Sequence, residues 1–322
     1  FRWCDGTYLE DQDFFRLCGI ARDNYLYARS KKRIDEVLVT PDLDSQYRNG
    51  SLNVKVTANS KLSFKAELLD AEGNIVGSKD ASGTGAEFSF EVPSVKKWSA
   101  ETPYLYTVRV SGGGEVIPVK TGFRKVEIKN AQLLVNGQPV LIKGADRHEL
   151  DPDGGYVVSR ERMLQDIKIM KEFNLNAVRT CHYPDDSYWY DLCDQYGIYM
   201  VAEANVESHG MGYGEATLAK DPAYENAHLQ RNIRNVERNY NHPAVIIWSL
   251  GNEAGYGPNF EKAYDIVKEM DPFRPVQYER SEYNGKSDIF CPMYYSYESS
   301  KNYSENETGK DWKTGGDTRF DK

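Results

Sequence analysis

The feature that most constrains the fold of this chain is a regular alternation of two kinds of segment from about residue 126 onward. Short apolar segments, typical of buried strands, alternate with segments of roughly 10 to 15 residues whose apolar side chains recur at helical spacing. The first such helix is expected over residues 160–173, with Ser159 as its N-cap and Met163 and Ile167 on its buried face. The alternation predicts a parallel sheet with helical crossovers.

The expected strands cover residues 140–143, 177–178, 198–202, 245–250, 276–278 and 288–291. Six strands are two fewer than the eight that close a (β/α)8 TIM barrel, so we predict an incomplete barrel over residues 126–322. After about residue 299 the chain is rich in Ser, Asn, Lys, Asp and Gly and shows no helix or strand periodicity. This end is expected to be a loop or a disordered tail.

Residues 31–125 have a different pattern. Residues 52–57 and 88–92 alternate apolar and polar side chains at the two-residue period of a strand, and the three glycines at 112–114 mark a turn. Several short strands separated by turn residues are typical of an all-β sandwich, and we expect one of the immunoglobulin-like type. Residues 1–30 are too few to form a core of their own.

Composition excludes several classes of partner. The formal net charge of −9 argues against nucleic acid or an anionic membrane as the main partner, and no apolar run approaches the roughly 20 residues of a membrane-spanning helix. The five cysteines are an odd number without a Cys-x-x-Cys pair, so free thiols are expected. We expect a cytoplasmic protein. Because the chain begins at Phe1 and not at a methionine, a periplasmic or secreted location stays open.

Polar side chains gather where three successive expected strands end. In a barrel of parallel strands, catalytic residues occupy the carboxyl ends of the strands, and core packing does not call for such a cluster. The clustered residues are Arg179 and His182 after the second strand, Glu207 and His209 after the third, and Asn252 and Glu253 after the fourth. This edge of the sheet is therefore the candidate active site.

Two of these groups suggest a chemistry from residue types alone. Glycoside hydrolysis typically uses two carboxyl groups that flank the bond, and Glu253 at a strand end could be one of them. Glu207 and His209 are two residues apart and point the same way on an extended segment, so they could hold a divalent ion. An ordinary hydrogen bond between this glutamate and this histidine is the simpler explanation when the residues are considered alone.

Three stretches of the sequence resemble one enzyme family. Residues 176–199, which contain Cys-His-Tyr-Pro, and residues 241–253, which contain Asn-His-Pro and Gly-Asn-Glu, match two signatures of the bacterial β-galactosidases within glycoside hydrolase family 2. Residues 2–13 resemble the same proteins. The resemblance implies a retaining enzyme that hydrolyses terminal non-reducing β-D-galactosides, such as lactose, by double displacement. It also implies that residues 1–30 are the C-terminal end of a jelly-roll sugar-binding domain.

The resemblance assigns roles to the clustered side chains. Glu253 would be the general acid/base, and Asn252 would hydrogen-bond the sugar 2-hydroxyl. His148 and His182 would contact galactosyl hydroxyls and stabilise the transition state. Arg179 would keep the nucleophile carboxylate ionised through its positive charge.

The resemblance also implies two cations. Glu207, His209 and Glu253 would bind Mg²⁺, which keeps several waters and therefore needs few protein ligands. Asp13 would reach from the jelly-roll into the site and bind both Na⁺ and galactose, with the other Na⁺ ligands beyond residue 322. Tyr294 would lie beside the nucleophile.

The sequence departs from the family at the nucleophile, because no Cys-Glu-Tyr segment follows a seventh strand. We therefore expect the isolated chain to be inactive, and its parent protein to be a homo-oligomer. The alternatives are another family 2 β-glycosidase such as a β-glucuronidase, a non-catalytic carbohydrate-binding fragment, and a hydrolase that depends on a metal held by Glu207, His209 and Glu253. The last would call for more nitrogen ligands. His228 is expected on a helix surface.

Overall fold

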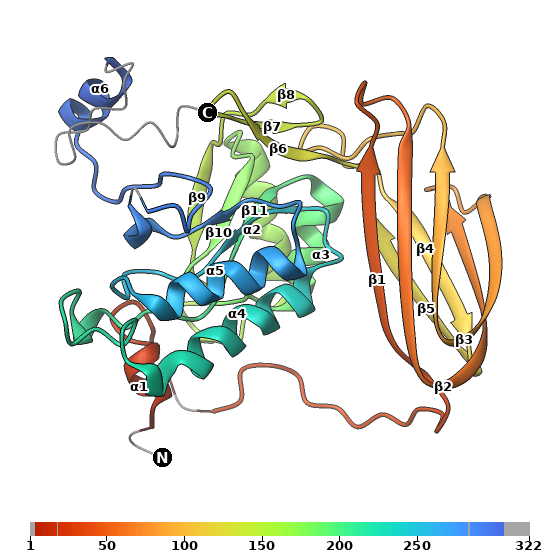
Figure 1. Ribbon diagram of the computed structural model, residues 1–322, viewed down its shortest axis with the longest axis horizontal. Helices are drawn as coiled ribbons and strands as arrows, with labels where there is room; N and C mark the ends of the chain where they lie inside the picture. The colour runs from red at the N-terminus through yellow and green to blue at the C-terminus, as the bar shows by residue number, and fades with distance from the viewer. Residues whose placement is uncertain (1–3, 18, 283, 306–322) are drawn as a thin grey trace.

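The computed structural model describes residues 4–17, 19–282 and 284–305. Figure 1 shows a β-sandwich on one side and a sheet covered by helices on the other, joined by an extended N-terminal segment that leads into the sandwich. In the described part of residues 4–30, the only helix is α1 (Gly6–Leu9), and one β-bridge joins Glu10 to Glu207. This part contains no strand of its own, so the jelly-roll stays a prediction.

The sandwich is one antiparallel sheet folded over its own core. The strand order is β1-β2-β4-β5, and β3 pairs with β2 along most of its length. The first half of β2 pairs with β1 and its second half with β4, so that both halves contribute to one apolar core. The predicted alternation over residues 52–57 and 88–92 is confirmed in the burial of β2 and β3. The strands are β1 (Ile34–Leu43), β2 (Gly50–Leu69), β3 (Ile75–Val92), β4 (Tyr106–Gly112) and β5 (Glu115–Thr121).

The second body is built on a parallel sheet in the order β13-β12-β11-β10-β9. A small antiparallel sheet of β6 (Val126–Lys129), β7 (Gln132–Val135) and β8 (Gln138–Pro139) precedes it. The parallel strands are β9 (Gly144–Arg147), β10 (Ala177–Thr180), β11 (Tyr199–Glu203), β12 (Val245–Ser249) and β13 (Val276–Gln277). The largest apolar core of the molecule lies between this sheet and its helices.

Two of the predicted strands were wrong. Residues 140–143 lie outside the parallel sheet, because the Asn176 side chain bonds their backbone, with Oδ1 accepting one N–H at 2.7 Å. Residues 288–291 form only an isolated bridge, because the Asp288 carboxylate accepts the N–H of Val276 at 2.8 Å. The sheet therefore has five parallel strands in the part of the chain that is described. Five strands are too few to close a (β/α)8 barrel, so the sheet is consistent with an incomplete one.

The helix predicted over residues 160–173 is confirmed, with its end one residue earlier at Glu172. Ser159 Oγ accepts the N–H of Arg162 at 3.1 Å, which is the predicted N-cap. The final segment was wrong in part, because residues 299–305 belong to a helix; residues 306–322 lie outside the described residues. No helix within the described ranges is long and apolar enough to cross a membrane. The helices are α2 (Arg160–Glu172), α3 (Ser187–Tyr196), α4 (Glu225–Asn239), α5 (Pro258–Met270) and α6 (Tyr297–Glu305), with 3-10 turns at His209–Met211, Pro222–Tyr224 and Glu279–Ser281.

Helix α4 buries polar side chains, which the sequence pattern did not reveal. His228 is 0% exposed, so its predicted surface position was wrong. Its Nδ1 donates to the carbonyl of Tyr224 at 2.9 Å, and its ring meets Phe260 edge-on. Asn232 donates to the carbonyl of Leu250 at 3.3 Å and so ties the helix to the end of β12. Burial lowers the pKa of His228 to about 4.

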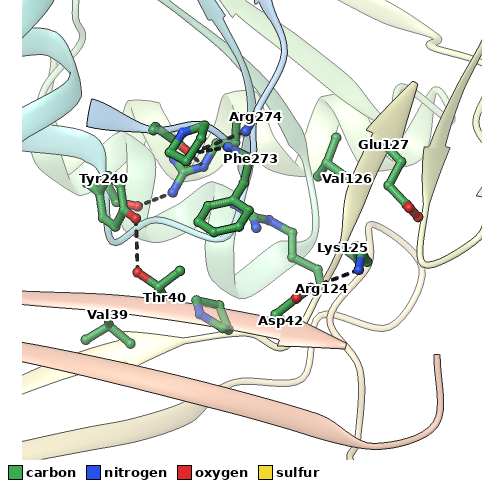
Figure 2. A pocket seen from close by; sticks show the side chains of 13 residues that line it. Val39, Thr40, Asp42, Arg124, Lys125, Val126, Glu127, Tyr240, Phe273 and Arg274 are labelled. Atoms are coloured by element: carbon green, nitrogen blue, oxygen red, sulfur yellow. Dashed lines mark hydrogen bonds and ion pairs between the residues drawn. The ribbon is translucent and has the colours of Figure 1, made fainter. Parts of the chain in front are cut away.

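The amino ends of the parallel strands face the sandwich. Arg124 is buried there and donates to the carbonyls of Pro243 (2.6 Å) and Val245 (2.9 Å). The hydroxyls of Thr40 and Tyr240 lie 3.0 Å apart across the same contact. A cavity of about 250 Å³ remains between the two bodies. Figure 2 shows the side chains that line it. It lies at the opposite end of the strands from the candidate site, so we assign it no part in that site.

Candidate active site

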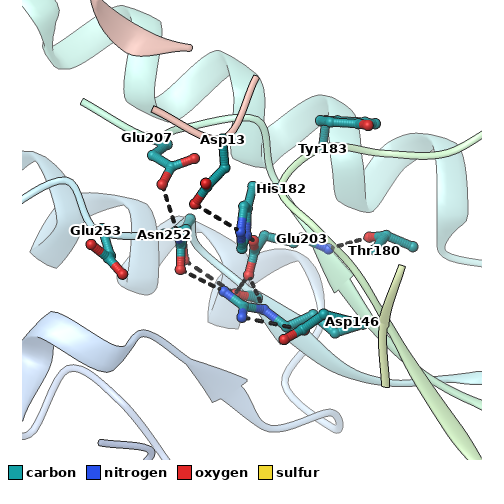
Figure 3. A network of polar contacts seen from close by, with 12 residues as sticks. Asp13, Asp146, Thr180, His182, Tyr183, Glu203, Glu207, Asn252 and Glu253 are labelled. Carbon is teal, nitrogen blue, oxygen red and sulfur yellow. Dashed lines mark hydrogen bonds and ion pairs between the residues drawn. The ribbon is translucent and has the colours of Figure 1, made fainter. Parts of the chain in front are cut away.

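A buried carboxylate organises the polar side chains at the carboxyl ends of the strands (Figure 3). Glu203 is the last residue of β11 and is 0% exposed. Its Oε2 accepts from Arg179 Nε and from the Ser249 hydroxyl, both at 2.6 Å, and its Oε1 accepts from His182 Nδ1 at 2.6 Å. Burial acts to raise the pKa of Glu203, but the charge of Arg179 and these hydrogen bonds hold it below its ordinary value. Glu203 is therefore an ionised anchor.

Arg179 connects this anchor to the next two side chains. Its Nη2 donates to Asn252 Oδ1 at 2.9 Å, and the Asn252 amide nitrogen donates to Glu207 Oε1 at 2.8 Å. Within the described residues, the other Glu207 oxygen is buried and has no hydrogen-bond partner. Burial, together with the nearby Asp13 carboxylate, raises the pKa of Glu207 to about 9. Glu207 is thus a buried acid with an unsatisfied oxygen.

The N-terminal segment brings Asp13 to this edge. The backbone of Glu207 forms two hydrogen bonds with residues 9–11, at 2.6 and 2.9 Å. This pairing leaves Asp13 Oδ2 at 3.6 Å from His182 Nε2. His148 stands beside His182 with their ring centroids 5.5 Å apart. Burial, and then the neighbouring His182, lower the pKa of His148.

Glu253 lies just beyond β12 and is 5% exposed. Its backbone has a φ of 36°, in the left-handed region that non-glycine residues rarely adopt. Its Oε2 accepts from the Tyr213 hydroxyl at 2.8 Å and lies 3.2 Å from His209 Nε2. Its Oε1 accepts from the Tyr294 hydroxyl at 3.1 Å, although the Tyr294 side chain is itself largely exposed. The Glu253 carboxyl group is thus held by side chains from two separate loops, one between β11 and α4 and one after β13.

Glu279 and Arg280, which follow β13, support Glu253 from a further side. Glu279 Oε1 accepts the backbone N–H of Glu253 at 2.9 Å and lies 3.2 Å from Arg280 Nε. The guanidinium carbon of Arg280 lies 3.9 Å from the ring centroid of Tyr213, which is a close cation–π contact. Burial raises the pKa of Glu279 to about 7 even though Arg280 acts in the opposite direction.

The structure brings the predicted site residues together at one edge of the sheet, although it does not test their roles. Contacts join these residues in two groups, which meet where Asn252 and Glu253 follow one another in the sequence. The first group is Asp13, His148, His182, Arg179, Asn252 and Glu207, joined through Glu203, and the second is His209, Glu253 and Tyr294. Tyr294 contacts Glu253; its predicted place beside a nucleophile stays a prediction. Four further residues at this edge, Glu203, Tyr213, Glu279 and Arg280, were not predicted from the sequence.

The predicted metal ligands are only partly assembled. His209 and Glu253 are in contact, whereas Glu207 is linked to Glu253 through its chain neighbour Asn252. Among the described residues, Glu207 instead forms a cluster with Asp13 and His182 at this site. One possible ligand atom from each of the three lies within 4.8 Å of the other two. A buried carboxylate with an unsatisfied oxygen, facing a second carboxylate, is nevertheless a suitable place for a hard cation. The residues present therefore fit a magnesium or sodium ion at Glu207.

Two models of one protein family match this chain, one for each of the two bodies of the structure. Residues 126–318 match the model of the TIM barrel domain of the glycosyl hydrolases family 2, and residues 32–124 match a second model of that family. The chain is 44% identical to a β-galactosidase of Pseudoalteromonas haloplanktis and 45% identical to one of Aeromonas hydrophila. Each match covers 91% of this chain and 30% of the relative, so the chain spans about 30% of the length of these relatives.

Solved structures show the same fold. A β-glucuronidase of Parabacteroides merdae has a TM-score of 0.75 at 23% identity, over 87% of this chain and 38% of that one. A β-glucuronidase of Faecalibacterium prausnitzii has a TM-score of 0.68 at 30% identity, over 81% of this chain and 45% of that one. With its TIM barrel domain matched over residues 126–318 and its sandwich over residues 32–124, the chain belongs to the glycosyl hydrolases of family 2.

Proposed function

We propose that this chain supplies the acid/base half of the active site of a retaining β-galactosidase, which hydrolyses terminal β-D-galactosides such as lactose. The observation that carries the proposal is the setting of Glu253. It lies at the carboxyl end of β12, next to Asn252, and its carboxyl group is held by Tyr213, His209 and Tyr294. A carboxyl group so placed can protonate the leaving-group oxygen and later deprotonate a water.

Asn252 is suited to recognise the sugar 2-hydroxyl. Its Oδ1 accepts from Arg179 and one N–H of its amide donates to Glu207, so both the position and the flip of the amide are fixed. An amide nitrogen carries two donors. The second N–H can therefore donate to a sugar hydroxyl, a contact that strengthens as positive charge develops on the ring in the transition state.

The second carboxyl group of the mechanism is expected outside the described residues. A retaining enzyme needs a nucleophile about 5–5.5 Å from the acid/base. The oxygens of Glu203 already accept from Arg179, His182 and Ser249, so this carboxylate is committed to structure. Glu279 is turned toward the backbone of Glu253. We therefore assign neither of them to the nucleophile.

Magnesium is part of the proposal, held by Glu207, His209 and Glu253. The unsatisfied oxygen of Glu207 and the raised pKa of this acid favour a cation, because a divalent ion would let the carboxylate ionise while buried. When bound, the ion would supply positive charge beside the acid/base. We also propose that Asp13 contributes to a sodium site, and that the whole protein is a homo-oligomer in the cytoplasm.

Sequence identity favours a galactoside over a glucuronide as the substrate. The chain is 44–45% identical to the two β-galactosidases but only 23–30% identical to the two β-glucuronidase structures. The test is to assay the whole protein on nitrophenyl β-galactoside and nitrophenyl β-glucuronide, and to follow the configuration of the first product by NMR. We expect β-galactose as the first product, and for Glu253→Ala a much larger loss of kcat/KM on lactose than on nitrophenyl β-galactoside. Preference for the glucuronide, or inversion at the anomeric carbon, would contradict the proposal.

A further inference from the structure

A closed ring of contacts surrounds Glu253. It starts at the backbone nitrogen of Glu253, which donates to Glu279 Oε1 at 2.9 Å. Glu279 Oε1 lies 3.2 Å from Arg280 Nε, and the Arg280 guanidinium stacks on the Tyr213 ring at 3.9 Å. The Tyr213 hydroxyl then donates back to Glu253 Oε2 at 2.8 Å. The ring therefore fixes both the backbone and the carboxyl group of the same residue.

The backbone conformation of Glu253 needs support from its surroundings. Glu253 has a φ of 36°, which is unfavourable for a residue with a Cβ and persists only where the surroundings hold it. Glu279 is 7% exposed, and its carboxylate accepts the N–H at this position. The hydrogen bond is strongest when Glu279 is ionised, because the acceptor is then charged. Glu279 thus holds the conformation from which the Glu253 side chain projects.

The side-chain part of the ring separates the two oxygens of Glu253. Oε2 is occupied by the Tyr213 hydroxyl and lies next to His209 Nε2. In the described part of the chain, Oε1 has one hydrogen bond, from Tyr294, whose side chain is 88% exposed and can be displaced by a substrate. Oε1 is therefore the oxygen that an incoming glycoside would meet.

We propose that Tyr213 and Glu279 are positioning residues that hold Glu253 with Oε1 directed at the leaving-group oxygen. This rests on the proposed function of Glu253 as the acid/base. Proton donation by a positioned acid contributes about 10²–10⁴-fold to a rate, and it matters most where the leaving group is poor. Losing the positioning should therefore slow poor substrates far more than activated ones.

The first test replaces one hydroxyl. Tyr213→Phe removes the donor to Oε2 but keeps the ring that stacks on Arg280. We expect kcat/KM for lactose to fall by about 10- to 100-fold, within the range of general acid catalysis, and kcat/KM for dinitrophenyl β-galactoside to fall less than about 3-fold. The matched control is Tyr264→Phe, which removes a hydroxyl bonded to Asp288 at 2.6 Å, away from the site. The control should leave the ratio of the two rates unchanged.

The second test compares two replacements of Glu279. Glu279→Gln keeps a carbonyl oxygen that can accept the Glu253 N–H, whereas Glu279→Leu has similar size and no acceptor. We expect the leucine variant to show the selective loss on lactose and the glutamine variant to recover most of it. Melting temperatures of all variants separate this pattern from a general loss of fold.

The outcomes separate this inference from the function on which it rests. If Glu253→Gln slows lactose and dinitrophenyl β-galactoside equally, the acid/base role of Glu253 fails. If Glu253→Gln is selective but Tyr213→Phe and Glu279→Leu lower both rates equally, or change neither, the positioning role is overturned and the proposed function stands. Selective loss in both variants supports the positioning role.

Discussion

Replacing Arg179 by methionine should destabilise the protein far more than breaking an ion pair of the same length at the surface. Arg179 Nε lies 2.6 Å from Glu203 Oε2, and the two side chains are 18% and 0% exposed. Removing one partner of a buried pair leaves an uncompensated charge and costs about 3–5 kcal/mol. His182 and Ser249 still donate to Glu203, so we expect the lower end, about 3 kcal/mol. That corresponds to a fall in melting temperature of about 6–12 °C for a unit of this size.

The matched control is Lys262→Met. Lys262 Nζ also lies 2.6 Å from a carboxylate oxygen, of Glu225, but the two side chains are 54% and 33% exposed. An exposed pair is worth about 1 kcal/mol or less. Calorimetry of both single variants shows whether burial or the distance between the charges determines how much an ion pair stabilises the protein. The double variant Arg179→Met with Glu203→Gln should recover part of the melting temperature that Arg179→Met loses. Equal melting temperatures for the two single variants would refute the reasoning.

Two further predictions concern protons and metal. His228 has a pKa of about 4 in the fold against an ordinary value of 6.5, so the unfolded chain binds the proton first and stability falls as pH falls through this window. The free energy of unfolding should lose about 2 kcal/mol between pH 7.5 and 5 from this group, and His228→Gln should abolish that part of the pH dependence, as urea titrations of both proteins would show; an unchanged slope would contradict it. Mg²⁺ should raise the activity of the whole protein, and Glu207→Gln should remove the response; activity indifferent to a chelator would exclude the metal.

The sequence predicted those strands and helices in which the order of apolar and polar residues follows the pattern of buried and exposed side chains. Period-two alternation over residues 52–57 and 88–92 located two strands of the sandwich, and helical spacing around Met163 and Ile167 located α2. The same logic predicted the place of the candidate site, because the carboxyl ends of parallel strands meet at one edge of the sheet.

The errors arose where a side chain forms hydrogen bonds with the backbone beside the sheet, or where a helix buries polar side chains. Asn176 bonds the backbone of Lys143, and Asp288 bonds the backbone of Val276 in β13, so two segments that border the sheet were misread as its strands. Helix α4 buries His228 and Asn232, whose polar spacing is that of an exposed face. Propensity and periodicity carry no information on such contacts.

The unpredicted members of the site depend on contacts between distant parts of the chain. Glu203 is important because Arg179 and His182 reach it from another strand end. Tyr213 comes from a glycine-rich loop with no periodic signal, and it meets Arg280 only after both loops fold. A charged residue that ends an apolar strand, as Glu203 does, is the signal that could have found the anchor.

The central claim is that Glu253 donates a proton to the leaving group, and the leaving-group dependence of Glu253→Gln tests it most directly. The measurement is kcat/KM of the whole protein and of the variant on a series of aryl β-galactosides whose phenols span a range of pKa. We predict a shallow dependence for the wild type and a steep one for the variant, with a loss of about 10²-fold or more for the poorest leaving groups and a few-fold for the best. A loss that is the same across the series would contradict the account.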